Sequence, residues 1–190
     1  EWSSDWVSRT TYGRMNSGAS VWPMKILAAP DSDSAPEVRI EQDDAFFACA
    51  RGRLKLRDFG DGTGELIHYD RADAPGPKLS DYVRASTADP AALREALSRA
   101  HGIHGRVCKT RWLLLVGQTR VHLDRVAGLG DCIELEVVLR PQQTLGEGAA
   151  IAEALLSRLQ VPTAQRLAGA YLDLLPAAPS AAGTAAARKS

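Results

Sequence analysis

The chain has 190 residues, and its 23 lysine and arginine residues balance its 23 aspartate and glutamate residues to a formal net charge of zero. This length fits one compact domain with tails, and the charge balance disfavours a globally basic nucleic-acid binder. The sequence contains no run of about 18 apolar residues, which excludes a transmembrane helix. The 3 cysteines have no CxxC spacing and favour a reducing compartment, so we expect a cytoplasmic protein without a membrane partner.

Composition divides the chain into three parts. Residues 1–36 show no lasting period of 2 or 3.6, so we expect an unmatched and poorly ordered N-terminal segment. Residues 37–176 carry the regular patterns and are predicted to form the folded domain. Residues 177–190 are rich in alanine and serine and are predicted to be a disordered tail.

Period-2 segments dominate the folded part and predict an α+β protein with an antiparallel sheet. We expect strands near residues 37–48, 51–58, 64–71, 79–86, 106–116, 119–125 and 132–140. A first helix should begin after Asp89, which is a good N-cap and is followed by Pro90. Two further helices fit residues 147–160 and 163–175.

Charged side chains are sorted onto one face of these strands, because successive residues of a strand point to opposite faces. Segment 51–57 has Arg51, Arg53, Lys55 and Arg57 on one face, and segment 132–140 has Glu134 and Glu136 on one face. An ordinary solvated face explains any single strand. Runs of one charge sign on several strands instead favour a curled sheet with a concave charged face and an outer apolar face under helices.

Two kinds of ligand would suit such a face. Glu134 and Glu136 stand about 7 Å apart on one side of a strand. Together with Asp124 they offer the hard oxygen ligands that suit Mg²⁺ or Mn²⁺. Lys55, Arg57, Arg111 and Arg120 offer the opposite charge, and arginine forks match the oxygens of a polyphosphate.

Several ordered motifs carry a resemblance to a known family. They are Q-D-D-A-F-F (42–47), G-R-L-K-L-R (52–57), G-E-L-I-H-Y-D-R (64–71), G-P-K (76–78), G-Q-T-R-V-H-L-D-R-V-x-G-L-G-D (117–131), E-L-E-V-V-L (134–139) and G-A-Y-L-D-L-L (169–175). Over residues 37–176 the chain resembles the CYTH domains, or triphosphate tunnel metalloenzymes. These include class IV adenylate cyclases, thiamine triphosphatases and inorganic triphosphatases.

The resemblance implies a closed antiparallel β-barrel with helices packed outside, whose tunnel binds a triphosphate. By position, the phosphate-binding residues would be Lys55, Arg57, Lys78, Arg111 and Arg120, with Arg53, Glu65, Arg71 and Lys109 as tunnel residues of second rank. The acids of the metal site would be Asp124, Glu134 and Glu136. No residue is assigned a catalytic role, and for His122 a ligand, an acid–base and a hydrogen-bonding role all stay open.

The chain departs from the family at its first strand, where an E-x-E-x-K motif is expected. Residues 1–36 contain no such motif, so we expect that the N-terminal element has been replaced. The first strand and half of the metal site would then be missing.

Two functions follow from these observations. The first is a metal-dependent enzyme, either a hydrolase or an adenylate cyclase-type enzyme, acting on a nucleotide, thiamine triphosphate or inorganic triphosphate. The second is a catalytically impaired phosphate- or polyphosphate-binding module. Nucleic acid is not an expected partner, because the basic segment 51–57 is interleaved with leucine rather than with stacking aromatic residues.

Overall fold

The computed structural model describes residues 7–14, 38–70, 78–79, 81–167 and 169–176. In this part of the chain, nine strands form one sheet in which every pairing is antiparallel, in the order β5-β1-β9-β8-β7-β2-β3-β4-β6. The strands are β1 (Val7–Arg14), β2 (Val38–Phe47), β3 (Arg53–Asp58), β4 (Gly64–Asp70), β5 (Lys78–Leu79), β6 (Asp81–Thr87), β7 (Ile103–Val116), β8 (Thr119–Val126) and β9 (Gly130–Val138). The predicted α+β class with an antiparallel sheet is therefore confirmed.

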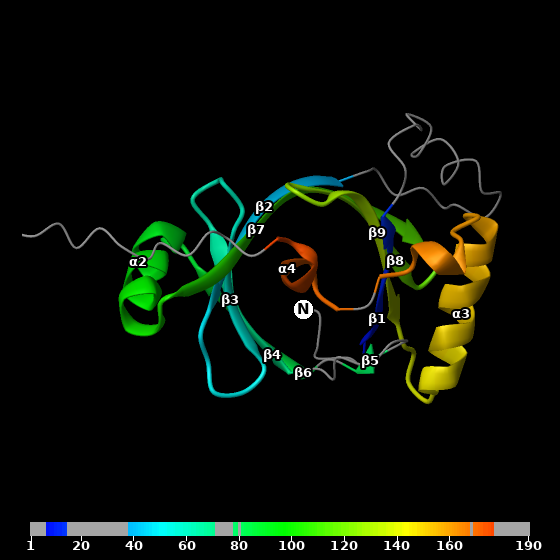
Figure 1. Cartoon of the computed structure of the whole chain (residues 1–190). Helices are drawn as coiled ribbons and strands as arrows, with labels where there is room; N and C mark the ends of the chain where they lie inside the picture. Colours follow the sequence, from blue (N-terminus) through cyan, green and yellow to red (C-terminus); the bar gives the residue numbers. More distant parts are fainter. Residues whose placement is uncertain (1–6, 15–37, 71–77, 80, 168, 177–190) are drawn as a thin grey trace, which may run out of the picture.

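The sheet is strongly curved (Figure 1). Its two edge strands are β5, which pairs with β1, and β6, which pairs with β4. These edge strands are separated by a single residue of sequence. The two ends of the sheet are thus joined along the chain.

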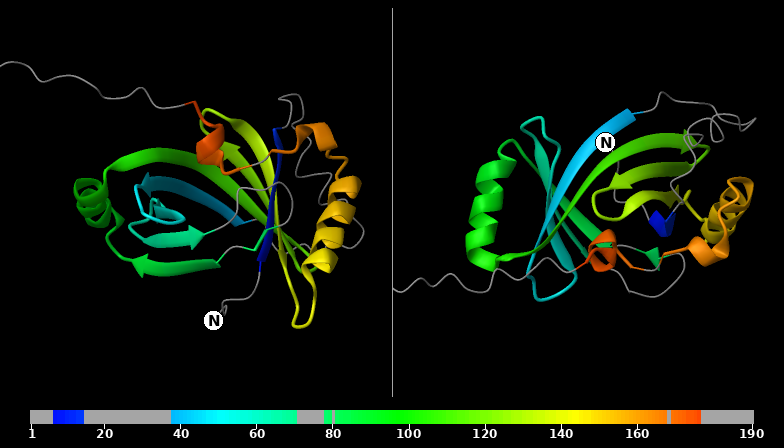
Figure 2. Two further views of the ribbon diagram at one scale, coloured as in Figure 1. Left: turned by 60° about the horizontal axis from the view of Figure 1, so that its bottom comes forward. Right: turned by 45° about the horizontal axis from the view of Figure 1, so that its top comes forward.

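Two helices cover the outer, convex face of the sheet on opposite flanks (Figures 1 and 2). Helix α2 (Pro90–His101) packs Leu93 and Leu97 against a core of Ala45, Phe47 and Leu56 on β2 and β3. Helix α3 (Leu145–Arg158) packs Ala152, Leu155 and Leu156 against β8 and β9. The apolar face of the sheet therefore points outward under helices, as the strand patterns predicted.

Strand β9 shows how the sequence produces this arrangement. Ile133, Leu135 and Val137 are fully buried in the core beneath α3. Glu134 and Glu136 alternate with them and consequently point to the concave side. Burial of the three apolar side chains stabilises the strand by about 5–9 kcal/mol in transfer free energy, which fixes the register that turns the acids inward.

The helix predictions were confirmed in part. Helix α2 begins at Pro90, and the Asp89 side chain accepts a hydrogen bond from the Ala92 amide at 2.9 Å. Helix α3 begins two residues earlier than expected, after a capping box formed by Thr144 and Glu147.

The prediction of one helix over residues 163–175 was wrong. The structure has a 3₁₀ turn, η1 (Thr163–Gln165), and a short helix, α4 (Tyr171–Leu174). Gly169 between them has a φ of 99°, a left-handed backbone conformation that a continuous helix does not allow. Within the part of the chain that the structure describes, no helix is both long and apolar enough to cross a membrane.

The expectation that the first strand is missing was also wrong. Strand β1 pairs along its length with β9 and also pairs with β5. Its sequence is V-S-R-T-T-Y-G-R, so the strand is present while the E-x-E-x-K motif is not. In the ladder, Arg9 stands opposite Glu136 and Thr11 opposite Glu134. The other residues of the predicted N-terminal segment, and residues 177–190, lie outside the described residues.

Candidate functional site

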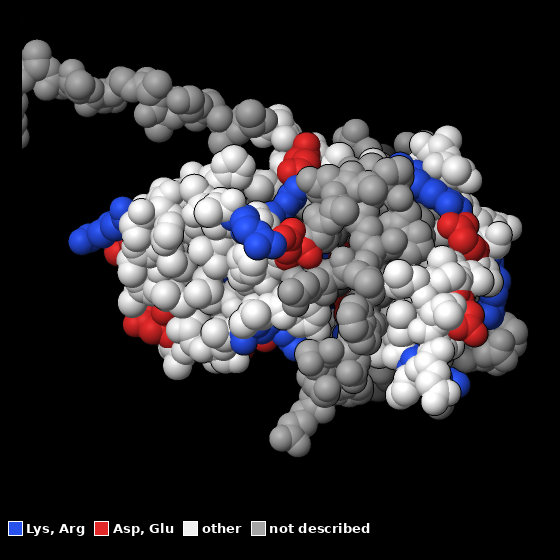
Figure 3. Space-filling view, turned by 90° about the horizontal axis from the view of Figure 1, so that it is seen from below, with Lys and Arg blue, Asp and Glu red and all other residues white. Residues whose placement is uncertain are grey.

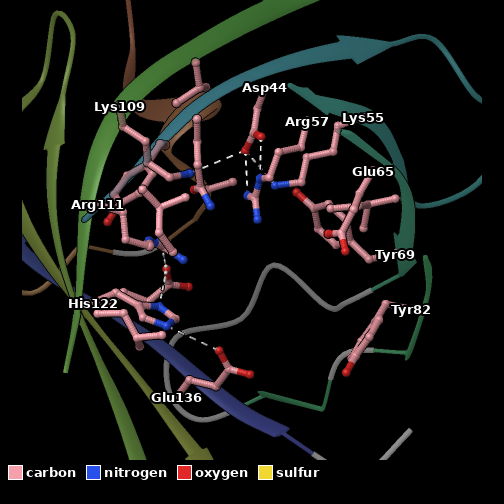
Figure 4. Close-up of a pocket in the computed structure, with 18 of the residues that line it drawn as sticks. Asp44, Lys55, Arg57, Glu65, Tyr69, Tyr82, Lys109, Arg111, His122 and Glu136 are labelled. Atoms are coloured by element: carbon pink, nitrogen blue, oxygen red, sulfur yellow. Dashed lines mark hydrogen bonds and ion pairs between the residues drawn. The ribbon is translucent and has the colours of Figure 1, made fainter. Parts of the chain in front are cut away.

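The concave face of the sheet encloses a cavity of about 530 Å³. This volume falls in the usual range for small-molecule sites. Side chains from β2, β3, β4, β6, β7, β8 and β9 line the cavity, and Ala170, Tyr171 and Leu172 at α4 complete its wall. Charged and apolar groups both contribute to this lining, and the charged groups form two clusters (Figure 4).

The first cluster, here called the Asp44 cluster, consists of Asp44, Lys55, Arg57 and Lys109. Asp44 accepts a hydrogen bond from Lys55 Nζ at 2.8 Å and two hydrogen bonds from Arg57, at 2.7 and 2.9 Å. Lys109 Nζ lies 3.4 Å from the same carboxylate. Strand β2 lies between β3 and β7, and this order brings cations from both neighbours to one acid.

Burial and mutual repulsion perturb the protonation of this cluster. Burial would raise the pKa of Asp44, but Lys109, Lys55 and Arg57 together hold it well below its ordinary value. Burial and the neighbouring Arg57 lower the pKa of Lys55 well below its ordinary value, and burial likewise lowers the pKa of Lys109. Such buried cations favour an anionic ligand that restores their charge balance.

The second cluster, the Arg111 cluster, consists of Arg111, Asp124, Glu134 and Tyr171. Arg111 donates two hydrogen bonds of 2.6 Å to Asp124 and one of 2.7 Å to Glu134. Tyr171 donates its phenol proton to Asp124 at 2.9 Å. Burial would lower the pKa of Arg111, but Asp124 and Glu134 raise it above its ordinary value. Arg111 is thus a permanent cation held between two strands.

His122 and Arg120 lie beside this cluster on β8. Arg120 donates to Glu136 at 2.8 Å. The His122 ring stands between two acids, with Nδ1 3.5 Å from Glu134 and Nε2 3.7 Å from Glu136. Burial and Arg111 lower the pKa of His122, so its imidazole is neutral at pH 7.

The structure brings most of the predicted site residues to one cavity. Its lining includes Lys55, Arg57, Glu65, Lys109, Arg111, Arg120, Glu134 and Glu136. Asp124 is buried behind Arg111 and is not part of the lining. Arg53 donates to Asp173 of α4 at 2.8 Å. Lys78 belongs to β5 by its backbone, and Arg71 lies outside the described residues.

Sequence reasoning missed Asp44 and Tyr171 as parts of the site. Asp44 belongs to the Q-D-D-A-F-F motif, and Tyr171 to G-A-Y-L-D-L-L. Both motifs were recognised, but a motif alone does not tell which of its side chains points into a cavity. Alternation groups Asp44 with Gln42 and Phe46 on one face of β2, and all three line the cavity, but the sequence does not say which face of the strand points inward.

The acids of the cavity meet part of the requirements of a metal ion. Among the described side chains, no group of three or more acidic, histidine or cysteine residues is arranged to hold a metal. Mg²⁺ is often held by only one or two carboxylates together with substrate phosphates. Glu134 and Glu136 supply such a pair at the cavity wall, so they fit a metal ion that shares the oxygens of a bound phosphate.

The charges of the outer surface are arranged differently. On the face shown in Figure 3, the described lysine and arginine residues form small separate groups, several of them beside acidic residues. The surface ion pair between Arg125 and Asp131, with side chains 68% and 45% exposed, is of this kind. On this face, therefore, the described charges are dispersed, in contrast to the charged clusters of the cavity.

Comparisons with known proteins agree with this architecture. The sequence profile of the CYTH domain matches residues 24–171. A solved structure from Pyrococcus horikoshii has a TM-score of 0.75 at 20% identity, covering 90% of this chain and 99% of its own. A protein of Vibrio parahaemolyticus, provisionally named an adenylate cyclase, has a TM-score of 0.69 at 16% identity, covering 90% and 97%.

A more distant structure belongs to the Schizosaccharomyces pombe Mediator head module. Its TM-score is 0.53 at 9% identity, covering 82% of this chain and 94% of its own. At these identities the structural likenesses establish a shared fold only. No match to this chain was found among curated protein sequences.

Proposed function

Because this chain belongs to the CYTH-domain family of triphosphate-tunnel enzymes, we propose that it cleaves or cyclises a small triphosphate inside its curled sheet. The observation that carries this proposal is the convergence of Lys55, Arg57, Lys109, Arg111 and Arg120 on one cavity. Five cations from three strands exceed what a monophosphate needs. They suit a chain of phosphates.

We assign the phosphates to the two clusters of the cavity. The Asp44 cluster would bind one part of the phosphate chain, and Arg111 and Arg120 would bind the next. Lys78, Arg53 and Arg71 would add further contacts. We also propose that the sheet closes as a barrel, because its edge strands β5 and β6 are nearly continuous in sequence.

The metal of the family fits at Glu134 and Glu136. A bound Mg²⁺ or Mn²⁺ would polarise a phosphoryl oxygen and neutralise developing charge. The cations of this chain would hold the phosphate chain in place and stabilise the same charge electrostatically. Asp124 has both oxygens engaged by Arg111 and Tyr171, and we therefore propose that it orients Arg111 rather than binding the metal directly.

The enzyme proposal is tested by release of phosphate or pyrophosphate. Purified protein would be incubated with ATP, thiamine triphosphate and tripolyphosphate, each with Mg²⁺ or Mn²⁺. We expect metal-dependent release from at least one of them, and a loss of at least about 100-fold in Glu136→Gln because a carboxylate ligand is removed.

The matched control for this experiment is Glu153→Gln. Glu153 pairs with Arg166 away from the cavity, at 2.8 Å, so this variant should keep full turnover. Equal turnover of Glu136→Gln and the wild type would show that Glu136 is not a ligand of the metal.

A second candidate function is a phosphate-binding module without turnover. It is favoured by β1, whose residues opposite Glu134 and Glu136 are Thr11 and Arg9 instead of acids. The fold also occurs in the Mediator head module. Tripolyphosphate binding by calorimetry, together with no product from any of the three substrates, would establish this function instead.

We propose the cytoplasm as the location of either function. Cys49, Cys108 and Cys132 are all free thiols in the structure, which suits a reducing compartment.

A further inference from the structure

We propose that Asp44 is a positioning residue that gathers Lys55, Arg57 and Lys109 into a single anion-binding group. This inference rests on the proposed function only for the nature of the anion, a polyphosphate. Asp44 itself would not touch the reacting atoms. Its role is to hold three cations in place before the anion arrives.

The position of Asp44 in the sheet makes this role possible. In the ladders of β2, Asp44 stands opposite Arg57 on β3 and opposite Val107 on β7. Lys55 and Lys109 are each two residues along from those partners and therefore share the same concave face. One carboxylate thus reaches cations on both neighbouring strands, at 2.7–3.4 Å.

The charge of the Asp44 cluster does not balance. One carboxylate faces three cations, and Asp44, Lys55 and Lys109 are 1%, 9% and 7% exposed. The bidentate pair with Arg57 would already balance the charge of the carboxylate. The two additional lysines leave an excess of positive charge in the cavity, which is costly unless an anion binds there.

Aromatic rings hold these lysines from the other side. Lys55 Nζ lies 5.6 Å from the centre of the Phe46 ring and 5.9 Å from that of Tyr69. Lys109 Nζ lies 5.6 Å from the centre of the Tyr171 ring. The faces of these rings attract a cation without neutralising it, so they help to fix the ammonium groups in place.

The other charged neighbours show what Asp44 contributes. The positive charges of Arg57 and Lys109 repel the Lys55 ammonium group and lower its pKa. Arg111 and Arg57 likewise repel the Lys109 ammonium group and lower its pKa. Asp124 attracts this group and raises its pKa. Asp44 attracts both lysines and raises the pKa of each, against burial, which lowers them. Without this carboxylate, both ammonium groups would lose protons more readily and move apart from Arg57.

Asp43 provides a matched control on the same strand. It points to the opposite face, where it pairs with Arg106 and Arg94 at the surface and does not line the cavity. Asp43→Asn and Asp44→Asn therefore make the same chemical change on opposite faces of β2.

The experiment has two readouts on these variants. The first is tripolyphosphate affinity by calorimetry between pH 7 and pH 9. The second is the titration midpoint of the Lys55 and Lys109 ammonium groups by NMR in the ligand-free protein. For Asp44→Asn we expect affinity reduced by about tenfold or more, with a loss that grows as pH rises, and lower midpoints for both lysines. Asp43→Asn should match the wild type in both readouts.

A conservative variant separates positioning from charge and covers the case in which Asp44→Asn fails to fold. Asp44→Glu keeps the charge but moves it outward by one methylene. We expect wild-type lysine midpoints with affinity still reduced by several-fold. Wild-type affinity in Asp44→Glu, or unchanged lysine midpoints in Asp44→Asn, would overturn the inference. If the wild type binds no tripolyphosphate, the proposed function fails, while the lysine midpoints still decide the role of Asp44.

Discussion

Arg111 illustrates how single residues in this cavity do two tasks at once. Its side chain is 8% exposed, and its guanidinium group joins Asp124 on β8 to Glu134 on β9. It also lines the cavity in which we place the phosphates. Only a planar fork with several donors can bind two carboxylates and still offer hydrogen bonds to a ligand.

Arg111→Lys is therefore expected to be far from conservative. A lysine keeps the charge but cannot make the paired hydrogen bonds to Asp124, so we expect a loss of about 1–3 kcal/mol in the free energy of unfolding. Tripolyphosphate affinity should fall at least about tenfold for the same reason. Urea unfolding and calorimetry measure the two effects.

Arg125→Lys is the control for that substitution. Arg125 also joins two strands through a carboxylate, Asp131, but its side chain is exposed to solvent. Exposed pairs contribute little to stability, so this variant should behave as the wild type in both measurements. If Arg111→Lys also matched the wild type in both measurements, the roles of Arg111 in joining the strands and in binding phosphate would both be wrong.

Asp43 and Asp44 show where sequence reasoning stops at this scale. The motif Q-D-D-A-F-F has acidic and aromatic residues at both parities, so alternation by itself does not say which aspartate points inward. The answer depends on register, since a shift of one residue exchanges the two faces. Lys55 and Arg57 were assignable because Leu54 and Leu56, which alternate with them, mark the opposite face.

At the scale of elements, the sequence predicted strands β2, β3, β4, β6, β7, β8 and β9, but it gave one strand over 79–86 where the structure has the separate strands β5 and β6. Alternation of leucine with charged residues is a strong signal for a strand. The predicted strands form because helices α2 and α3 bury their apolar face. Strand β1 was missed because V-S-R-T-T-Y-G-R has no such alternation. Its place is specified by pairing with β9 and β5, which are distant in sequence and do not appear in local patterns.

Helix α2 supports the strands that carry the Asp44 cluster. It packs on Ala45, the neighbour of Asp44, and on Leu56, which separates Lys55 from Arg57. Asp89→Ala removes the side-chain acceptor of the Ala92 amide and should lower the free energy of unfolding by about 1 kcal/mol. Thermal unfolding measures this loss, and Asp89→Asn, which keeps an acceptor, should recover most of it.

At the scale of the whole molecule, the ion pairs on both faces of β2 contribute to the response to acid. The pKa of Asp43 is lowered chiefly by Arg106, and the pKa of Asp44 is lowered by its three cations against burial. A carboxyl group with a lowered pKa in the folded state contributes stability above its unfolded value, near 3.8, and loses it as pH falls through the folded value. We therefore expect urea midpoints to decrease steadily below about pH 4.

Asp43→Asn separates this effect from general acid unfolding. The variant has one fewer group that must be protonated, so its stability should decrease less steeply between pH 4 and pH 2 than that of the wild type. Parallel curves for the two proteins would contradict the linkage assigned to Asp43.

The place of α4 has a consequence for synthesis of the protein. This helix is the last described element of the chain. It supplies Tyr171 to Asp124, while its Asp173 binds Arg53 of β3. A ribosome makes the chain from its N-terminus, so all strands with cavity cations emerge before α4. A nascent chain therefore has its anion-binding groups before it has the wall that shapes their cavity, and the site is completed only as translation of the domain ends.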